Sequence, residues 1–238
     1  MTLILLQVIT QTVSSTLYWV GLGRGIDGLP GPPMRRAWRI GSALVLATWL
    51  IAMVLLAAND VFRNGPFPPR VPTALLVTLA AGYLALLSGT FRQVIADIPQ
   101  HWLIGIQAFR VLGAGFLIRY LQGGLPGVFA IPAGVGDVLT GIFAPLVAYW
   151  WFAGKPYARR AAIAWNLFGM ADLVIAVTLG VLTRGGGGGI VFPLVLIPIY
   201  AVPRAFLLHS YSLIGLFGKA ARKDGATAPE TGLQTLPA

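Results

Sequence analysis

Residues 38–58 decide the fold class. They read WRIGSALVLATWLIAMVLLAA, and Arg39 is the one charged side chain among them. At about 1.5 Å per residue, an α-helix of this length crosses a hydrocarbon core of about 30 Å. A strand of a membrane barrel needs only about 9–11 residues and alternates in polarity, which this stretch does not. The stretch therefore predicts a transmembrane helix.

The composition of the whole chain agrees with this prediction. Of the 238 residues, 57% are hydrophobic and 10% are charged, and the mean hydropathy is +0.79. A soluble domain is usually about 45–50% apolar and about 25% charged. The composition excludes a soluble globule, and the large apolar content excludes an intrinsically disordered chain. The absence of cysteine excludes disulfides, thiolate metal sites and cysteine nucleophiles.

Six further apolar runs, bounded by charged residues, Gly and Pro, bring the predicted spans to seven. The predicted spans cover residues 2–21, 38–58, 71–90, 101–121, 128–152, 161–183 and 191–216. We therefore predict an all-α polytopic membrane bundle of seven transmembrane helices over residues 1–217. Residues 218–238 are polar and contain Pro and Gly, which predicts a disordered cytoplasmic tail.

The basic residues predict the orientation of the bundle. Eleven lie in one set of loops, namely Arg24, Arg35, Arg36, Arg39, Arg92, Lys155, Arg159, Arg160, Lys219, Arg222 and Lys223. Four lie in the opposite set, namely Arg63, Arg70, Arg119 and Arg184. Because cytoplasmic loops are enriched in Lys and Arg, the N-terminus is predicted outside and the C-terminus inside. The net charge of +10 is spread over many short loops, so it indicates no nucleic-acid partner.

Apart from Arg39 and Arg119, which lie at span ends and are counted with the loops, four charged side chains fall inside the predicted spans: Arg110, Asp137, Asp172 and Arg204. Each unpaired ion at mid-bilayer costs about 2.5–3.5 kcal/mol, so these groups should pair with one another or line water. Counting residues from the helix ends places Arg110, Asp172 and Arg204 near one level and Asp137 closer to the outer side. Two interpretations stay open. The charges form structural ion pairs that lock the bundle, or they form a site for a ligand, an ion or a proton.

Three polar residues lie near the same charges. Gln107, Asn166 and His209 are predicted in a second layer, nearer the cytoplasmic ends of their helices. Gln107 and Arg110 are three positions apart in the sequence, a spacing that puts both side chains on the same face of a helix. The predicted ligand-binding residues are therefore these three together with the four charges, and no catalytic or metal-ligating set is indicated. In the first span, a polar stripe predicts hydrogen bonds between helices. It consists of Gln7, Gln11, Ser14 and Tyr18.

Parts of the predicted spans four to seven resemble functionally uncharacterised bacterial multi-spanning inner-membrane proteins. The resemblance rests on Gln107–Arg110, on Leu125-Pro126, on Phe129–Asp137, and on the segment from Val202-Pro203 through Leu208-His209 to Ser212-Leu213. It implies a multi-pass protein of the bacterial inner, or cytoplasmic, membrane. It implies no activity.

Binding or transport of a small molecule or ion between predicted helices four to seven is the function that these residues favour. Two alternatives stay open: an accessory or structural subunit with a partner in a membrane complex, and a membrane-embedded haem or lipid redox protein that uses His209. Apart from that haem, no cofactor is indicated, and the sequence favours a protein that is not an enzyme. Retinal is excluded, because a Schiff base needs a lysine within a span. The lysines are Lys155, Lys219 and Lys223, all outside the spans.

Overall fold

The structure is a computed structural model that describes residues 2–62, 70–183 and 190–226, and within these ranges the fold is all-α. The helices are α1 (Thr2–Ile26), α2 (Pro32–Ala58), α3 (Arg70–Ala85), α4 (Gly89–Asp97), α5 (Gln100–Gly105), η1 (Ile106–Gly113), α6 (Ala114–Leu121), α7 (Gly127–Phe152), α8 (Ala158–Leu182), η2 (Ile197–Ala201) and α10 (Val202–Ala226). The segment η1 is a 3-10 helix and η2 is a π-helix.

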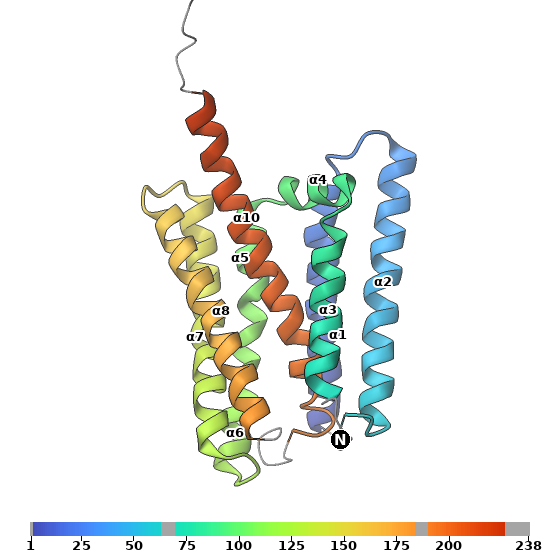
Figure 1. Cartoon of the computed structure of the whole chain (residues 1–238), viewed down its shortest axis with the longest axis vertical. Coiled ribbons are helices and arrows are strands. Elements are labelled where there is room, and N and C mark those ends of the chain that lie inside the picture. Colours follow the sequence, from blue (N-terminus) through green and yellow to red (C-terminus); the bar gives the residue numbers. More distant parts are fainter. Residues whose placement is uncertain (1, 63–69, 184–189, 227–238) are drawn as a thin grey trace, which may run out of the picture.

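The long helices form one bundle (Figure 1). Helices α7 and α8 make one side, α1 and α2 make the other, and α10 crosses between them in contact with α8 and α3. The short helix α4 lies across the others near one end. The first turn of α1 and the last turn of α10 lie at opposite ends of the bundle.

Four described helical segments are long and apolar enough to cross a membrane: Pro32–Ala58, Gln100–Leu121, Gly127–Phe152 and Ala158–Leu182. The pair α3 and α4, bent by 95°, gives a fifth if it counts as one span. These segments imply a lipid bilayer around the protein. Helices α1 and α10 are not among these candidate segments.

The helix bounds differ from the predicted spans at several places, among them α1, which continues to Ile26, and α2, which begins at Pro32. The span predicted over residues 71–90 ends at Ala85, and α4 starts in a new direction after Ser88, whose hydroxyl accepts a hydrogen bond from the amide of Phe91 at 3.3 Å. Ser is a favourable N-cap, so this side chain supports a new helix start. Helix α10 continues to Ala226, past the predicted start of the tail at Gly218. The rest of the predicted tail, residues 227–238, lies outside the described residues.

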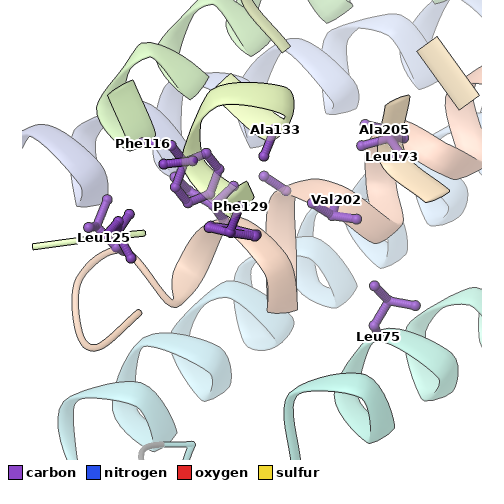
Figure 2. Close-up of a cluster of buried hydrophobic side chains, with 12 residues drawn as sticks. Leu75, Phe116, Leu125, Phe129, Ala133, Leu173, Val202 and Ala205 are labelled. Atoms are coloured by element: carbon purple, nitrogen blue, oxygen red, sulfur yellow. The ribbon is translucent and has the colours of Figure 1, made fainter. Parts of the chain in front are cut away.

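The largest apolar cluster joins several helices near the end of the bundle where α6 lies (Figure 2). It contains Leu75 of α3, Phe116 of α6, Phe129 of α7 and Leu173 of α8, all nearly inaccessible to solvent. The rings of Phe116 and Phe129 meet edge to face with centroids 5.3 Å apart, a favoured aromatic geometry. The cluster fixes η2 and the start of α10 against α7 and α8, and so sets the position of Arg204 and His209 in the fold.

Glycines bring α7 unusually close to the segment that carries Arg110. A Cβ added at Gly141 would lie 2.9 Å from Val111 Cγ2 and 3.0 Å from the carbonyl carbon of Arg110. A Cβ at Gly134 would lie 2.6 Å from Leu117 Cγ. Small residues at helix contacts of membrane proteins permit this close approach. Helix α7 is therefore positioned backbone to backbone against η1 and α6.

Candidate functional site

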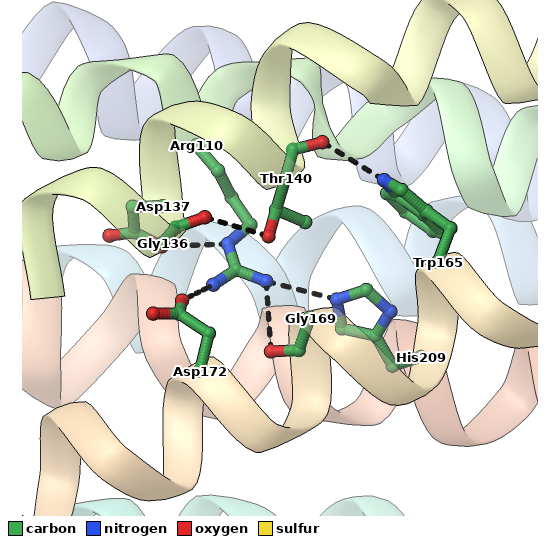
Figure 3. Close-up of polar contacts among 8 residues, drawn as sticks. All are labelled: Arg110, Gly136, Asp137, Thr140, Trp165, Gly169, Asp172 and His209. Carbon is green, nitrogen blue, oxygen red and sulfur yellow. Dashed lines mark hydrogen bonds and ion pairs between the residues drawn. The ribbon is translucent and has the colours of Figure 1, made fainter. Parts of the chain in front are cut away.

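Arg110 is the centre of a buried polar cluster built from four helical segments (Figure 3). Its Nε donates to Asp137 Oδ1 at 2.7 Å, and its Nη2 donates to Asp172 Oδ2. Its Nη1 donates to the carbonyl of Gly169 at 3.2 Å and lies 3.0 Å from His209 Nε2. The side chain of Arg110 is 2% exposed and those of the two acids are 12% and 7% exposed. A single guanidinium thus forms ion pairs with two carboxylates inside the bundle.

Local backbone features bring these groups together. Arg110 lies on the 3-10 segment η1, in the middle of the candidate span Gln100–Leu121. A stretch of 3-10 helix inside a longer helix is typical of a strained or functional position. A Cβ at Gly113 or at Gly136 would collide with the carboxyl groups of Asp137 and Asp172, respectively. Both carboxylates therefore occupy space that only a glycine on the neighbouring helix leaves free.

The hydrogen bonds of His209 determine which of its ring nitrogens carries the proton. A guanidinium has donors and no acceptor, so Nε2 must accept from Arg110. The other nitrogen, Nδ1, lies 2.9 Å from Asn166 Oδ1 and carries the proton that it donates. The Asn166 amide agrees with this assignment, because its Nδ2 donates to Ala162 O at 2.7 Å and to Ser212 Oγ at 2.8 Å. His209 is therefore neutral, with its proton on Nδ1.

The polar contacts continue from His209 to the end of the bundle that is predicted to face the cytoplasm. Ser212 Oγ accepts from Asn166 and from Gln100 Nε2, and Gln100 also donates to Ser212 O at 3.2 Å. All three side chains are buried. Sequence reasoning missed Ser212 and Gln100. The signal for Ser212 was its position three residues after His209, which places it on the same helix face.

A second set of contacts holds α7 against α8 beside the cluster. Trp165 Nε1 donates to the carbonyl of Thr140 at 3.0 Å, and Thr140 Oγ1 donates to Gly136 O at 2.8 Å. The ring of Trp165 lies 4.8 Å from that of His209, centroid to centroid. Trp165 is buried against the polar cluster. Its indole needs a partner there, and Thr140 supplies one.

Arg204 lies apart from the acids, so the four charges, which were expected to pair with one another or to line water, do not form one cluster. Its Nη2 donates to Gln11 Oε1 at 2.9 Å and Ser14 Oγ at 3.0 Å, and its Nη1 donates to Ser15 Oγ at 2.9 Å. Its Nε donates to the carbonyl of Tyr200 at 3.1 Å. In the described part of the chain no carboxylate is within ion-pair distance of it. The polar stripe of α1 therefore serves as the neutral acceptor surface for a buried cation.

Aromatic faces complete the environment of Arg204. Its guanidinium carbon lies 3.8 Å from the ring centroid of Tyr200 and 4.6 Å from that of Tyr18. Cation–π contacts contribute about 2 kcal/mol or more when the cation is desolvated. Arg204 is 5% exposed, so these contacts are desolvated. Neutral oxygens and π-faces together replace the missing counter-ion.

Gln107 is buried close to the cluster without joining it. It is fully inaccessible, and neither its amide nitrogen nor its amide oxygen has a hydrogen-bond partner among the described residues. Gln7 Oε1, on α1, is also buried without a partner. Gln7 borders a cavity of about 20 Å³ whose wall also includes Gln11, Arg110 and Asp137. This volume accommodates about one water molecule.

The geometry of His209 disfavours the haem alternative. Both ring nitrogens already have partners, Arg110 and Asn166, so ligation of an iron would break one of these contacts. A Cβ at Gly169 would collide with the imidazole, which shows that α8 packs directly on its ring. Across residues 2–62, 70–183 and 190–226, no group of three or more His, Asp or Glu side chains is placed to hold a metal ion.

Comparison with known proteins gives one match. The model of a family described as a domain of unknown function, DUF8737, matches residues 69–217. No curated protein and no solved structure matches the chain. The matched segment begins one residue before α3 and ends within α10. It contains the whole Arg110–Asp137–Asp172–His209 cluster. It also covers more than half of the 238 residues. The chain therefore belongs to the DUF8737 family.

Proposed function

We propose that this protein is a seven-span carrier of the bacterial inner membrane that binds and moves a small cation, in the simplest case a proton. The observation that carries the proposal is the ratio of charges at Arg110. One guanidinium contacts two carboxylates, Asp137 and Asp172, while Arg204 is held elsewhere by neutral groups. With both acids ionised, the cluster would hold one more negative than positive charge.

An excess buried charge is unfavourable, because no water solvates it. Two ion pairs would cancel their own charge and would act only as a structural lock. A single arginine shared by two acids instead leaves room for one further positive charge. Uptake of a proton or another small cation neutralises the cluster, and Arg110 then retains one ionised partner. This is the arrangement that a site for reversible cation binding requires.

Polar groups on both sides of the cluster support a path through the bundle. Towards the end predicted to face the cytoplasm, hydrogen bonds run from His209 through Asn166 to Ser212 and Gln100. On the other side, the cavity of about 20 Å³ separates Asp137 from the amide of Gln7 on α1. The 3-10 and π segments beside the cluster are the irregular backbone that transporters often place near the midplane.

Seven crossings with the N-terminus outside are part of the proposal. Helix α1 and the η2–α10 segment run along the bundle beside the candidate spans, and the two ends of the described chain lie on opposite sides (Figure 1). Because the chain has no cysteine, single cysteines placed in each loop can be labelled without background. Cysteines at residues 31, 92, 156 and 222 should react with a membrane-impermeant maleimide only after the cytoplasmic side is opened. A cysteine at residue 123 should react in intact cells.

Transport is tested in liposomes that contain the purified protein and a trapped pH-sensitive dye. A potassium diffusion potential, set with valinomycin, should drive proton entry above the rate of protein-free liposomes. Asp172→Asn and Asp137→Asn should each reduce this rate at least tenfold. Asp97→Asn, which removes an exposed acid of α4, is the matched control and should leave the rate unchanged. Equal rates in wild type, Asp172→Asn and empty liposomes would contradict a proton carrier.

A further inference from the structure

A large apolar groove lies on the side of the bundle away from the Arg110 cluster. Its volume is about 950 Å³, and it is bordered by α1, α2, α3, α4, α5, the start of η1 and α10, whose Arg204 is among the lining residues. Trp38 and Trp49 of α2, Ala81 of α3 and Leu207 of α10 are among its lining residues. Helix α2 is the least buried of the candidate spans, so the groove lies between a peripheral helix and the main bundle. The volume is at the upper end of the range for ligand sites.

The length and position of the groove match one leaflet of a bilayer. Along α2 it extends from Ala37 to Trp49, which corresponds to about 18 Å at the rise of an α-helix. Half of a hydrocarbon core is about 15 Å. The groove begins near the first turns of α2, the end that is rich in arginine and is predicted to face the cytoplasm. Its depth therefore suits the acyl chains of a lipid from the inner leaflet.

The mouth of the groove is basic. Trp38 and Phe91, from α2 and α4, stack there with ring centroids 6.5 Å apart, and both line the groove. Arg35 lies three residues before Trp38 on the same face of α2, and Arg92 follows Phe91 on α4. Each member of the aromatic pair thus has an arginine within one helical turn of it in the sequence.

These arginines are free to bind an anion. Arg39 has a carboxylate partner, Asp27, at 2.5 Å. Across the described ranges, no carboxylate lies within ion-pair distance of Arg35 or Arg92, and the buried Nε of Arg35 has no hydrogen-bond partner. Basic pockets between membrane helices on the cytoplasmic side bind phosphate-containing lipid head groups. The charge at the mouth is complementary to such a head group, and the apolar walls below it are complementary to acyl chains.

We propose that this groove is a binding site for an anionic phospholipid of the inner leaflet. Its phosphate contacts Arg35 and Arg92, and its acyl chains lie along α2, α3 and α10. A zwitterionic lipid with the same chains would fill the apolar walls without satisfying the excess positive charge at the mouth. The site therefore selects by head group and not by chain.

The test compares spin-labelled phosphatidylglycerol with spin-labelled phosphatidylcholine of identical chains, each added to the full-length protein in phosphatidylcholine liposomes. The immobilised fraction of the electron paramagnetic resonance spectrum measures association. Wild type should prefer phosphatidylglycerol, and Arg35→Gln and Arg92→Gln should each lower the preference about fivefold. Arg160→Gln, at the predicted cytoplasmic end of α8 and away from the groove, is the matched control and should retain it.

A second variant tests the groove itself. Gly41 lines the groove, and a Cβ there meets no atom within 4 Å, so Gly41→Trp should fill the space without disturbing the fold. It should reduce the immobilised fraction of both lipids, whereas Leu55→Trp, on the exposed face of α2, should not. Equal association of both lipids with wild type would overturn the proposal. So would oxidative cross-linking of Gly41→Cys between two copies, which would show that another chain occupies the groove.

Discussion

Asp137 and Asp172 lie on different helices and bind the same guanidinium, that of Arg110: Asp137 accepts from Nε at 2.7 Å and Asp172 accepts from Nη2. The cation therefore holds α7, α8 and η1 together. Its removal leaves two buried carboxylates facing each other without a counter-charge, and breaking a buried pair in this way costs about 3–5 kcal/mol.

Arg110→Gln should accordingly be the most destabilising single substitution in the cluster. Thermal unfolding in mild detergent should show a large decrease in the midpoint temperature. The triple variant Arg110→Gln, Asp137→Asn, Asp172→Asn removes all three charges and should recover most of the loss. If the triple variant is as unstable as Arg110→Gln, the cost arises from packing and not from the unpaired carboxylates.

Two glycines of α8 offer a matched pair of substitutions. A Cβ at Gly169 would collide with His209 and lie 3.1 Å from Arg110 Nη1, whereas a Cβ at Gly180 would make an ordinary contact with Phe129 at 3.5 Å. Gly169→Ala should lower the stability by about 1–3 kcal/mol, because the imidazole and guanidinium must move. Gly180→Ala should be neutral or stabilising by up to about 1 kcal/mol, because alanine favours the helix. Unfolding midpoints of the two variants in detergent provide the comparison.

The contact between Arg204 and Gln11 can be measured with a double-mutant cycle. Gln11→Leu removes one acceptor of a buried cation and should cost about 1–3 kcal/mol. Arg204→Met leaves Gln11 and Ser14 without their donor, so the double variant should lose less than the two single losses combined. Thr12→Ala is the control on the same helix. Thr12 is exposed, and its hydroxyl donates to the carbonyl of Val8, one turn earlier in α1. Its effect should add to that of Arg204→Met within about 0.5 kcal/mol.

His209 should show a defined tautomer in nitrogen NMR. Of the two histidines in the chain, His209 has an Nε2 that faces a donor and an Nδ1 that faces an acceptor. In protein with labelled histidine, the spectrum should show a protonated Nδ1 and an unprotonated Nε2. The variant His101→Asn assigns the signal, because it leaves His209 as the one histidine. A signal from the opposite tautomer would contradict the contact with Arg110.

Much of the fold could be predicted because the apolar runs are long and end at charged or turn-forming residues. Residues 128–152 were predicted as a span and form α7 over Gly127–Phe152, and residues 101–121 match the continuous segment Gln100–Leu121. The bend before α4 was missed, because Leu86 and Leu87 continue the apolar run up to the capping Ser88. Hydropathy alone does not report a change in helix direction.

The pairing of Arg110 with Asp137 and Asp172 was predictable in kind, because charges inside apolar spans have few other partners. Counting residues along the helices placed Asp137 closer to the outer side, and its carboxylate lies against Gly113, one turn further along the span than Arg110. His209 and Asn166 were predicted in one layer and contact each other, and the contact of His209 with Arg110 was not predicted. The separation of Arg204 from the acids depends on how α1 is rotated, and a list of polar positions does not determine that rotation.

The winding of η1 has a mechanical consequence. Its eight residues cover about 16 Å as a 3-10 helix and would cover about 12 Å as an α-helix. The change from three to 3.6 residues per turn would also rotate α6 relative to α5 by about 160° over these residues. Rewinding this one segment would therefore convert axial travel of about 4 Å into nearly half a rotation. Arg110 lies within η1, so a change in the winding of this segment would change the orientation of Arg110 and the length of the span together.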